Sequence, residues 1–199
     1  MKTLFTVGPK QVGIEDDGSV SFIGGMTIDA DGSPRAYGPR TAAALDDLAN
    51  AGHDGNWWGI ATDTGLPDGR PLVQGPHDPF PGYYISTTAY MVPGFERTDP
   101  RAYLDSEKVP FIVVPGRLVR AVQGVVLGCK ARITDLRSAK IAWAVVGDIG
   151  PDNHLGEASM AAASALGIPN DPIKGGSSGP FLYELWPGVP APGFLLQRS

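Results

Sequence analysis

The sequence predicts a single, mainly β domain with two helices, arranged as a β-barrel. The 199 residues are enough to bury one core. The chain holds 27 glycines and 19 prolines without a collagen-like period, which indicates many turns between short strands. Three Val/Ile-rich runs, at 109–116, 120–135 and 140–150, are short and bounded by glycine or proline. This pattern is typical of the buried strands of a barrel.

The first half of the chain begins with two predicted strands. Residues 3–8 and 19–30 alternate between apolar and polar side chains, as half-buried strands do. After a turn-rich stretch, "TAAALDDLANAG" at 41–52 predicts the first helix. Thr41 is its expected N-cap, and Gly52 is expected to end it.

The remaining elements follow the same reasoning. Residues 56–63 and 82–92 are predicted strands joined by a proline-rich loop, and 101–108 is predicted to form one helical turn. After the three Val/Ile-rich strands, the alanine-rich segment 156–167 predicts the second helix. Residues 179–189 are then expected to form the last strand.

Composition limits the class of partner. A formal charge of −5 and a pI near 5.1 argue against nucleic acid, which requires a basic surface. Cys129 is the single cysteine, so an internal disulfide framework and a multi-cysteine metal site are both excluded. No apolar run approaches the ~20 residues of a membrane span. No secretory signal is visible at the start of the sequence. We therefore expect a chain that stays inside the cell, is exported without a signal or has lost a leader, and its localisation is left open.

Two carboxylates flank a glycine-rich loop in "GDIGPDNHLGEASMAAASALGI" at 147–168. Asp148 follows a predicted strand, where it can either point into a cleft or cap a turn. Glu157 is expected at the start of the second helix, where the macrodipole favours its ionised form. A general-acid role would need burial or a neighbouring charge to outweigh that effect.

The pair suggests a reaction. Hydrolysis of a glycosidic bond needs one protonated and one ionised carboxyl group on either side of the bond. Inverting enzymes hold these two groups ~6.5–9.5 Å apart, so that a water molecule fits between them. A strand-end aspartate and a glutamate at the next element can face one cleft, although the spacing along the sequence does not establish it.

A family resemblance sharpens this expectation. "AWAVVGDIGPDNHLGEASMAAASALGI", with "MTIDADGSPRAYGP" and "YYISTTAYMV", resembles the glycoside hydrolase family 75 chitosanases over Met26–Gly188. The resemblance implies an inverting endo-hydrolase of chitosan, the β-1,4-linked glucosamine polymer, with Asp148 as general base and Glu157 as general acid. The segment is also similar to the aspartate-containing strand of double-psi β-barrel glycosidases and lytic transglycosylases. This similarity implies a six-stranded double-psi-like barrel, with residues 1–20 as an N-terminal extension of one catalytic domain spanning 1–199.

Several residues are candidates for substrate binding. Asp29 and Asp31, in "IDADGS", can pair with the ammonium groups of chitosan or simply form a turn. Trp57 and Trp58 are adjacent on one predicted strand, so one should enter the core and the other can stack on a sugar ring. Asp63 is either a further cleft carboxylate or, the safer interpretation, a turn cap.

Two further candidates lie in aromatic and glycine-rich segments. Tyr83 and Tyr84 are expected to divide between core and surface as the tryptophans do, with Tyr84 assigned to substrate. Ser177 belongs to "KGGSSGPF", which lacks P-loop order and fits a substrate-lining loop. The three histidines are dispersed in loops without metal-ligand spacing, so we expect no zinc site. His154 lies between the two carboxylates and either modulates their titration or, as the preferred interpretation, points into solvent.

Two other functions stay open at this point. Fungal members of the family are secreted with leaders and often carry disulfides, unlike this chain, so a phage or effector-type glycosidase acting on peptidoglycan is one alternative. A non-catalytic module that binds amino-sugar polymers is the other. In either case we expect no cofactor or metal, a polysaccharide as the partner, no nucleic acid or membrane, and a monomer.

Overall fold

The computed structural model describes residues 2–39 and 43–198. The chain divides into two compact units. The barrel unit comprises the described residues up to Asp29 and from Val109 onward, and the inserted unit comprises Ala30–Lys108. Each unit is described by itself.

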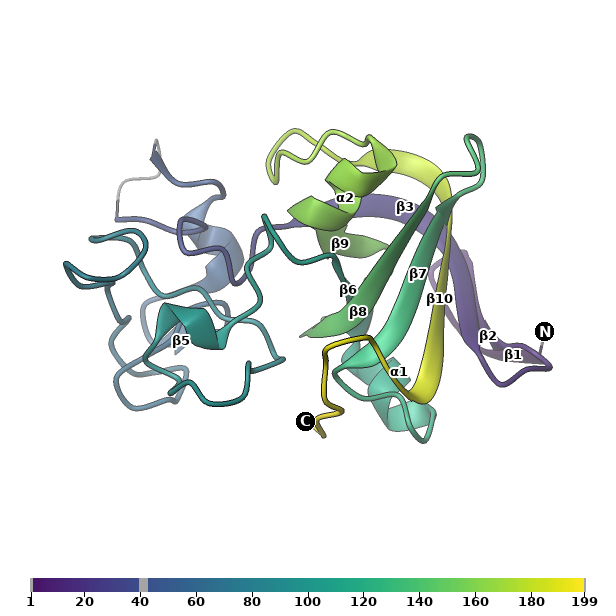
Figure 1. Ribbon diagram of the computed structural model, residues 1–199, viewed down its shortest axis with the longest axis horizontal. Helices are drawn as coiled ribbons and strands as arrows, with labels where there is room; N and C mark the ends of the chain where they lie inside the picture. The colour runs from purple at the N-terminus through teal and green to yellow at the C-terminus, as the bar shows by residue number, and fades with distance from the viewer. Residues whose placement is uncertain (1, 40–42, 199) are drawn as a thin grey trace. The chain divides into compact units, whose positions relative to one another are not determined.

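The barrel unit is a closed six-stranded sheet, so the predicted mainly β fold with a six-stranded barrel is confirmed (Figure 1). The strands in spatial order are β3 (Val20–Asp29), β10 (Ser177–Pro190), β7 (Cys129–Asp135), β8 (Ile141–Gly150), β6 (Phe111–Pro115) and β9 (Glu157–Ser159). The sheet closes because β9 pairs in parallel with β3. Pairing is also parallel between β6 and β8 and antiparallel elsewhere around the barrel. A hairpin of β1 (Lys2–Val7) and β2 (Lys10–Ile14) extends the sheet along β3.

Alternate residues of each strand fill the barrel. Phe22 of β3 stacks on Tyr183 of β10, with ring centroids 4.8 Å apart and planes 8° from parallel. Ile133, Ile112 and Leu185 are fully buried on neighbouring strands. The Val/Ile-rich runs of the sequence therefore become core strands because their branched side chains pack well on a pleated sheet.

The described residues contain two α-helices, α1 (Gly116–Ala121) and α2 (Met160–Leu166). Ser159 is the N-cap of α2, accepting a hydrogen bond from the Ala162 amide, and Gly167 ends the helix in the left-handed conformation. The predicted helix 156–167 therefore starts too early, because its first residues pair as β9. Helix α1 was not predicted, since its sequence precedes and overlaps a β-branched run that was assigned to a strand.

The inserted unit has little regular structure. Its described elements are the 3₁₀ turns η2 (Leu48–Ala51) and η3 (Pro100–Ala102) and the two-residue strands β4 (Gly52–His53) and β5 (Asn56–Trp57). The predicted strands at 56–63 and 82–92 are mostly wrong, because outside β5 they form only isolated bridges, such as that of Ile60 with Ser86.

In place of the predicted helix at 41–52, the described residues form no α-helix but the 3₁₀ turn η2, which ends at Gly52 as expected. The expected cap Thr41 lies outside the described residues. The Leu45 and Asp46 amides donate to the carbonyls of Arg35 and Ala36. The Asp46 carboxylate in turn accepts from the Asp47 amide and the Asn50 side chain. These contacts satisfy the backbone outside a helix, the usual way in which aspartate and asparagine compete with helical hydrogen bonding.

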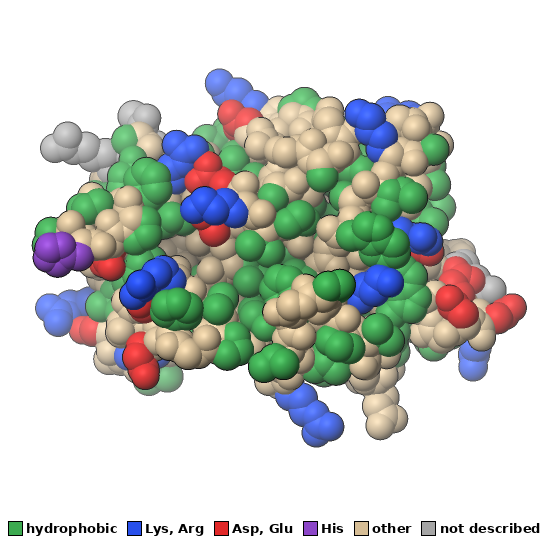
Figure 2. Space-filling view, viewed as in Figure 1, with side chains coloured by type: hydrophobic (Ala, Val, Ile, Leu, Met, Phe, Trp, Pro, Cys, Tyr) green, Lys and Arg blue, Asp and Glu red, His purple; other side chains and the backbone are tan. Residues whose placement is uncertain are grey.

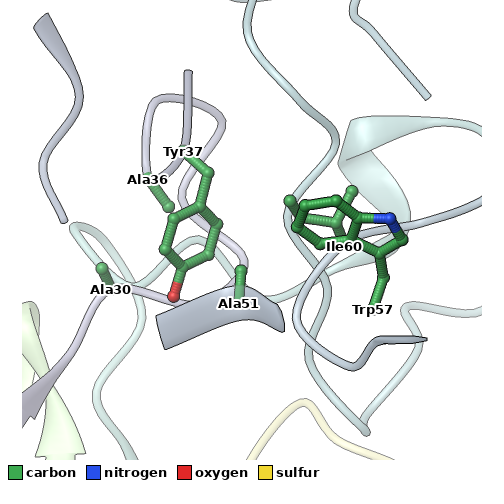
Figure 3. Close-up of a cluster of buried hydrophobic side chains, with 6 residues drawn as sticks. All are labelled: Ala30, Ala36, Tyr37, Ala51, Trp57 and Ile60. Carbon is green, nitrogen blue, oxygen red and sulfur yellow. The ribbon is translucent and has the colours of Figure 1, made fainter. Parts of the chain in front are cut away.

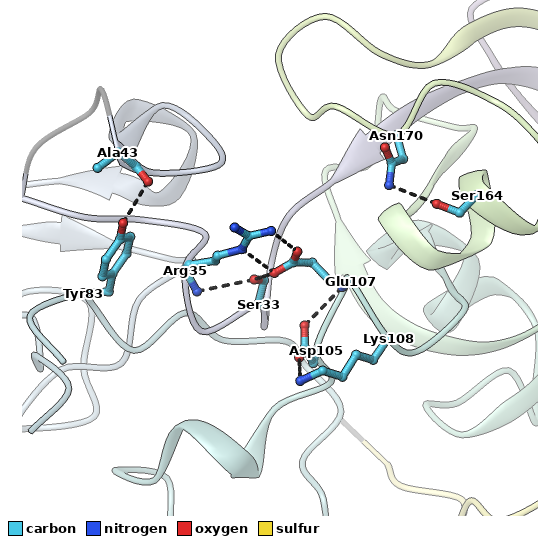
Figure 4. Close-up of polar contacts among 9 residues, drawn as sticks. All are labelled: Ser33, Arg35, Ala43, Tyr83, Asp105, Glu107, Lys108, Ser164 and Asn170. Carbon is cyan, nitrogen blue, oxygen red and sulfur yellow. Dashed lines mark hydrogen bonds and ion pairs between the residues drawn. The ribbon is translucent and has the colours of Figure 1, made fainter. Parts of the chain in front are cut away.

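Small clusters hold the inserted unit together. Figure 3 shows one apolar cluster, formed by Ala30, Ala36, Tyr37, Ala51, Trp57 and Ile60. Figure 4 shows a polar cluster in which the Glu107 carboxylate accepts three hydrogen bonds. They come from Arg35 Nε at 2.9 Å, Arg35 Nη2 at 2.5 Å and the Ser33 hydroxyl at 2.8 Å. Because the inserted unit has little β-sheet hydrogen bonding, its structure depends mainly on side-chain contacts.

On the face seen in Figure 2, basic and acidic side chains are interspersed among apolar ones. Among the helices of the described residues, none combines the length and the apolar character that crossing a membrane requires.

Candidate functional site

Val113 of β6 lies between the two carboxylates that the sequence singles out. Its register partner on β8 is Asp148, and its register partner on β9 is Glu157. Register partners on adjacent strands project to the same face of a sheet. Asp148 and Glu157 therefore share one face of the barrel wall. Their Cα atoms are two strand spacings apart, about 9–10 Å.

An irregularity in β8 brings Asp148 to this face. Ile112 pairs with Val146, but the next residue, Val113, pairs with Asp148, so Gly147 is an extra residue in the ladder. In a regular ladder Asp148 would pair with Val114, which is completely buried. Because one inserted residue reverses the side-chain alternation, the bulge turns Asp148 to the face of Val113 and Glu157. The Ile149 amide donates to Asp148 Oδ1 at 2.7 Å.

Glu157 is held in a strand and does not start a helix, contrary to the sequence-based expectation. It pairs with Thr27 on one side and Val113 on the other. The helix α2 begins at Met160 with Ser159 as its N-cap. Glu157 is therefore not in the first turn of a helix, and the expected stabilisation of its ionised form by a helix macrodipole does not hold. The Glu157 side chain is 25 % exposed, so water and a ligand can both reach it.

Two glycines lie close to Glu157, one directly before β9 and one in β8. Gly156 has φ +93°, and a Cβ there would lie 2.5 Å from the Gly25 carbonyl oxygen, so β9 approaches β3 only because this position lacks a side chain. A Cβ at Gly150 would lie 3.7 Å from Glu157 Oε2 and 3.0 Å from Val113. The carboxyl group of Glu157 therefore lies beside bare backbone of β8.

Asp29 joins the two carboxylates on the same sheet face. It is two residues beyond Thr27 on β3 and pairs with Ser159, and it is 7 % exposed. A carboxylate oxygen of Asp29 lies within 4.8 Å of one from Asp148. Two carboxylates this close repel each other when both are ionised, and they can share a proton, bind an ammonium group or hold a hard cation between them.

His154, for which the sequence left open either an influence on the titration of the two carboxylates or a place in solvent, lies beside Glu157. Its side chain is 40 % exposed, so the expected access to solvent is partly kept. Its Nε2 lies 3.0 Å from Thr27 Oγ1 and 3.9 Å from Glu157 Oε2. Burial, and then the positive charge of Lys10, lower the pKa of the imidazole below its ordinary value. The position of His154 three residues before Glu157 was the available signal.

Ser177 also belongs to the barrel unit. It starts β10 and pairs with Met26 of β3. Its hydroxyl oxygen accepts from Arg137 Nη2 at 3.0 Å and from the Gly179 amide at 3.3 Å. These bonds give Ser177 a structural role in the turn, and its predicted contact with substrate stays a prediction.

The other predicted binding residues belong to the inserted unit. Trp57 is 7 % exposed and packs in the apolar cluster of Figure 3, whereas Trp58 is 57 % exposed. The predicted division between core and surface is thus confirmed, with Trp58 as the outward residue. Its Nε1 donates to the Asn50 carbonyl at 2.8 Å, which fixes the ring. Both indoles line a pocket together with Ile60, Leu66, Met91 and Tyr103.

Asp31, Asp63 and Tyr84 each have internal partners. Asp31 accepts a hydrogen bond of 2.7 Å from the Tyr37 hydroxyl. Asp63 accepts from the Arg70 amide and forms an ion pair of 2.9 Å with its side chain, which matches the turn-capping interpretation and lowers the pKa of this carboxyl. Tyr84 is half-buried against the apolar cluster, and Tyr83 is half-buried as well, so the tyrosines do not divide as the tryptophans do.

The structure therefore brings together Asp29, Asp148 and Glu157 on one sheet face of the barrel unit and adds His154 beside them. It places Asp31, Trp57, Trp58, Asp63 and Tyr84 in the inserted unit. A scan against protein-family models finds no family that matches this chain, and a search of curated proteins finds no match either.

Proposed function

We propose that the chain is an inverting glycoside hydrolase that cleaves a β-1,4-linked glucosamine polymer. One observation carries the proposal: Asp148 and Glu157 flank Val113 on a single sheet face. Side chains rooted about 9–10 Å apart can hold their carboxyl groups within the ~6.5–9.5 Å of inverting enzymes. The resemblance to family 75 chitosanases assigns the roles.

In the proposed reaction, Glu157 gives its proton to the glycosidic oxygen as that bond to the anomeric carbon breaks. Asp148 takes a proton from the water molecule whose oxygen forms the new bond to the same carbon. The two carboxyl groups thereby exchange protonation states, and solvent restores them.

The neighbourhood of the pair supports an amino-sugar substrate. Glucosamine units carry ammonium groups, and the buried Asp29 carboxylate beside Asp148 offers a charge-assisted partner for one of them. Acetylation removes that positive charge, so this contact would favour the deacetylated polymer. The chain's net charge of −5 acts in the same direction.

The test is the release of reducing ends from soluble chitosan by the wild type, Asp148→Asn and Glu157→Gln. Each substitution keeps the shape of the side chain and removes its acid–base chemistry, so we expect losses of about 10²–10⁴-fold. Asp152→Asn is the matched control, because Asp152 lies in the same loop but its side chain is 52 % exposed and pairs with Arg120. NMR of the first products should show inverted anomeric configuration.

The outcomes separate the alternatives. Near-wild-type activity in either carboxylate variant would refute the role given to that residue. Release of fragments from peptidoglycan and none from chitosan would keep the carboxyl pair but replace the substrate. Binding of polymer without new reducing ends in any variant would identify a binding module.

A further inference from the structure

The loop before β9 places an imidazole beside the proposed general acid, and the following inference rests on the proposed function. Thr27 Oγ1 lies 3.2 Å from the Gly156 carbonyl oxygen and 3.0 Å from His154 Nε2. A hydroxyl group has one proton to donate. In the tautomer that carries its proton on Nε2, His154 donates to the Thr27 hydroxyl oxygen while Thr27 donates to the carbonyl.

This arrangement fixes the ring next to Glu157. The imidazole is held at Nε2 by Thr27 of β3, and the loop that carries it turns through the hydrogen bond from the His154 amide to the Pro151 carbonyl. Glu157 Oε2, 3.9 Å from Nε2, is the same oxygen that lies beside Gly150. One oxygen of the carboxyl group is thus placed between the imidazole and the bare backbone of β8.

We propose that His154 is a positioning residue for Glu157, whose anchored, neutral imidazole lies beside Oε2 and allows the carboxyl group to keep the proton that it donates. Were the imidazole to become a cation, its charge 3.9 Å from Oε2 would favour the carboxylate and remove that proton. The neutral form is the one that the surroundings favour, since burial and Lys10 both oppose a positive charge there.

The charged and titratable groups around this imidazole come from several elements. Lys10 of β2, whose Nζ donates to the Leu155 carbonyl at 2.5 Å, and Glu157 of β9 are the charged groups placed beside it. Asp152 precedes it by two residues in the same loop, and the buried Tyr183 of β10 belongs to the barrel wall. Asp152 is bound by Arg120 and by the Arg117 amide. Tyr183 donates its proton to the Gly25 carbonyl, and burial raises the pKa of its hydroxyl, so it stays neutral.

The test compares two substitutions that differ in charge. His154→Gln keeps a neutral donor for Thr27, and His154→Lys puts a permanent cation next to Glu157. For kcat/KM on soluble chitosan oligomers, we expect the basic limb of the pH profile to stay in place for His154→Gln and to move about one pH unit lower for His154→Lys. At neutral pH His154→Lys should lose about tenfold in kcat with KM little changed. His77→Lys introduces the same charge at an exposed histidine and should leave the limb in place.

A second measurement does not depend on turnover. NMR titration of the Glu157 carboxyl carbon, assigned by its loss in Glu157→Gln, should move to lower pH in His154→Lys and remain near the wild-type position in His154→Gln. An unchanged titration in His154→Lys would overturn the inference, as would a basic limb that moves equally in His77→Lys. Absence of sugar release by the wild type would refute the proposed function instead, and the carboxyl titration would still decide the role of His154.

Discussion

Glu157 Oε2 lies 3.7 Å from the point where a β-carbon at position 150 would be, so this carboxyl group rests within ordinary contact distance of the Gly150 backbone. The same β-carbon would be 3.0 Å from Val113, the residue between the two carboxylates. A methyl group at this position would therefore press on the buried Val113 side chain, the register partner of both Asp148 and Glu157.

We expect Gly150→Ala to lower chitosan hydrolysis by about 10-fold or more, because small displacements of a reacting group are costly. The free energy of unfolding should change by less than about 1 kcal/mol, since position 150 is only half-buried and its φ suits any residue. Activity and urea unfolding measured side by side test this. Gly75→Ala, where the new atom meets only an ordinary contact at 3.7 Å, is the control and should retain activity.

Gly156→Ala should destabilise the barrel by about 3 kcal/mol or more. Its β-carbon would lie 2.5 Å from the Gly25 carbonyl oxygen, where β9 closes the sheet against β3, and its φ of +93° adds backbone strain. Gly18→Ala separates the two causes, because Gly18 has φ +82° and open space around it. That control should lose only about 1–2 kcal/mol. Equal losses in urea unfolding would show that the close approach contributes nothing.

Glu107 should make the stability of the inserted unit depend on acid pH. The hydrogen bonds from Arg35 lower the pKa of this carboxyl below its ordinary 4.5. A lowered pKa means that the stabilisation is fully present above pH 4.5 and is lost as the pH falls through the folded value. Glu107→Gln should cost about 1–3 kcal/mol at pH 7 and flatten the pH dependence of unfolding below pH 4.5.

The control for Glu107 is Arg70→Gln, which breaks an ion pair whose arginine side chain is 90 % exposed. Such pairs contribute about 0–1 kcal/mol. Tryptophan fluorescence during urea unfolding, repeated across the pH range, gives both results. A Glu107→Gln protein that keeps the wild-type slope with pH would contradict the assignment.

The adjacent tryptophans should behave oppositely. Trp57→Ala removes a ring that is 7 % exposed and should cost about 3–5 kcal/mol of stability. Trp58→Ala removes a ring that is 57 % exposed and should cost less than about 1 kcal/mol. If Trp58 stacks on a sugar ring, its loss should raise KM for chitosan several-fold and leave kcat unchanged. An unchanged KM would assign Trp58 to surface packing alone.

The barrel was predictable because its strands are encoded by short Val/Ile-rich runs or by runs in which apolar and polar residues alternate. β3, β6, β8 and β10 were all expected close to where they lie. The inserted unit was not, since its Asp46 and Asn50 side chains replace helical hydrogen bonds with local ones. Propensity favours a helix over 41–52, but it does not describe such competition.

The candidate site was predictable in its residue types but not in its geometry. Asp148 and Glu157 stand out as carboxylates beside glycines, yet their common face depends on one extra residue, Gly147, in the β6–β8 ladder. Sequence patterns do not locate such bulges. The contact of His154 with Thr27 could not be predicted, because the two residues are 127 positions apart along the chain.

Ser159 links the two places where the chain leaves and re-enters the barrel unit. It is the register partner of Asp29, its hydroxyl donates to the Val109 carbonyl at 2.8 Å, and it accepts from the Phe111 amide at 3.0 Å. Asp29 and Val109, where the chain leaves and re-enters the barrel unit, are therefore neighbours whatever segment connects them. The entropic cost of closing a loop between two such points rises only slowly with the length of the loop. Evolution could thus lengthen, shorten or exchange the segment between these junctions while the same six strands persist, which makes 30–108 the natural region for relatives of this protein to diverge.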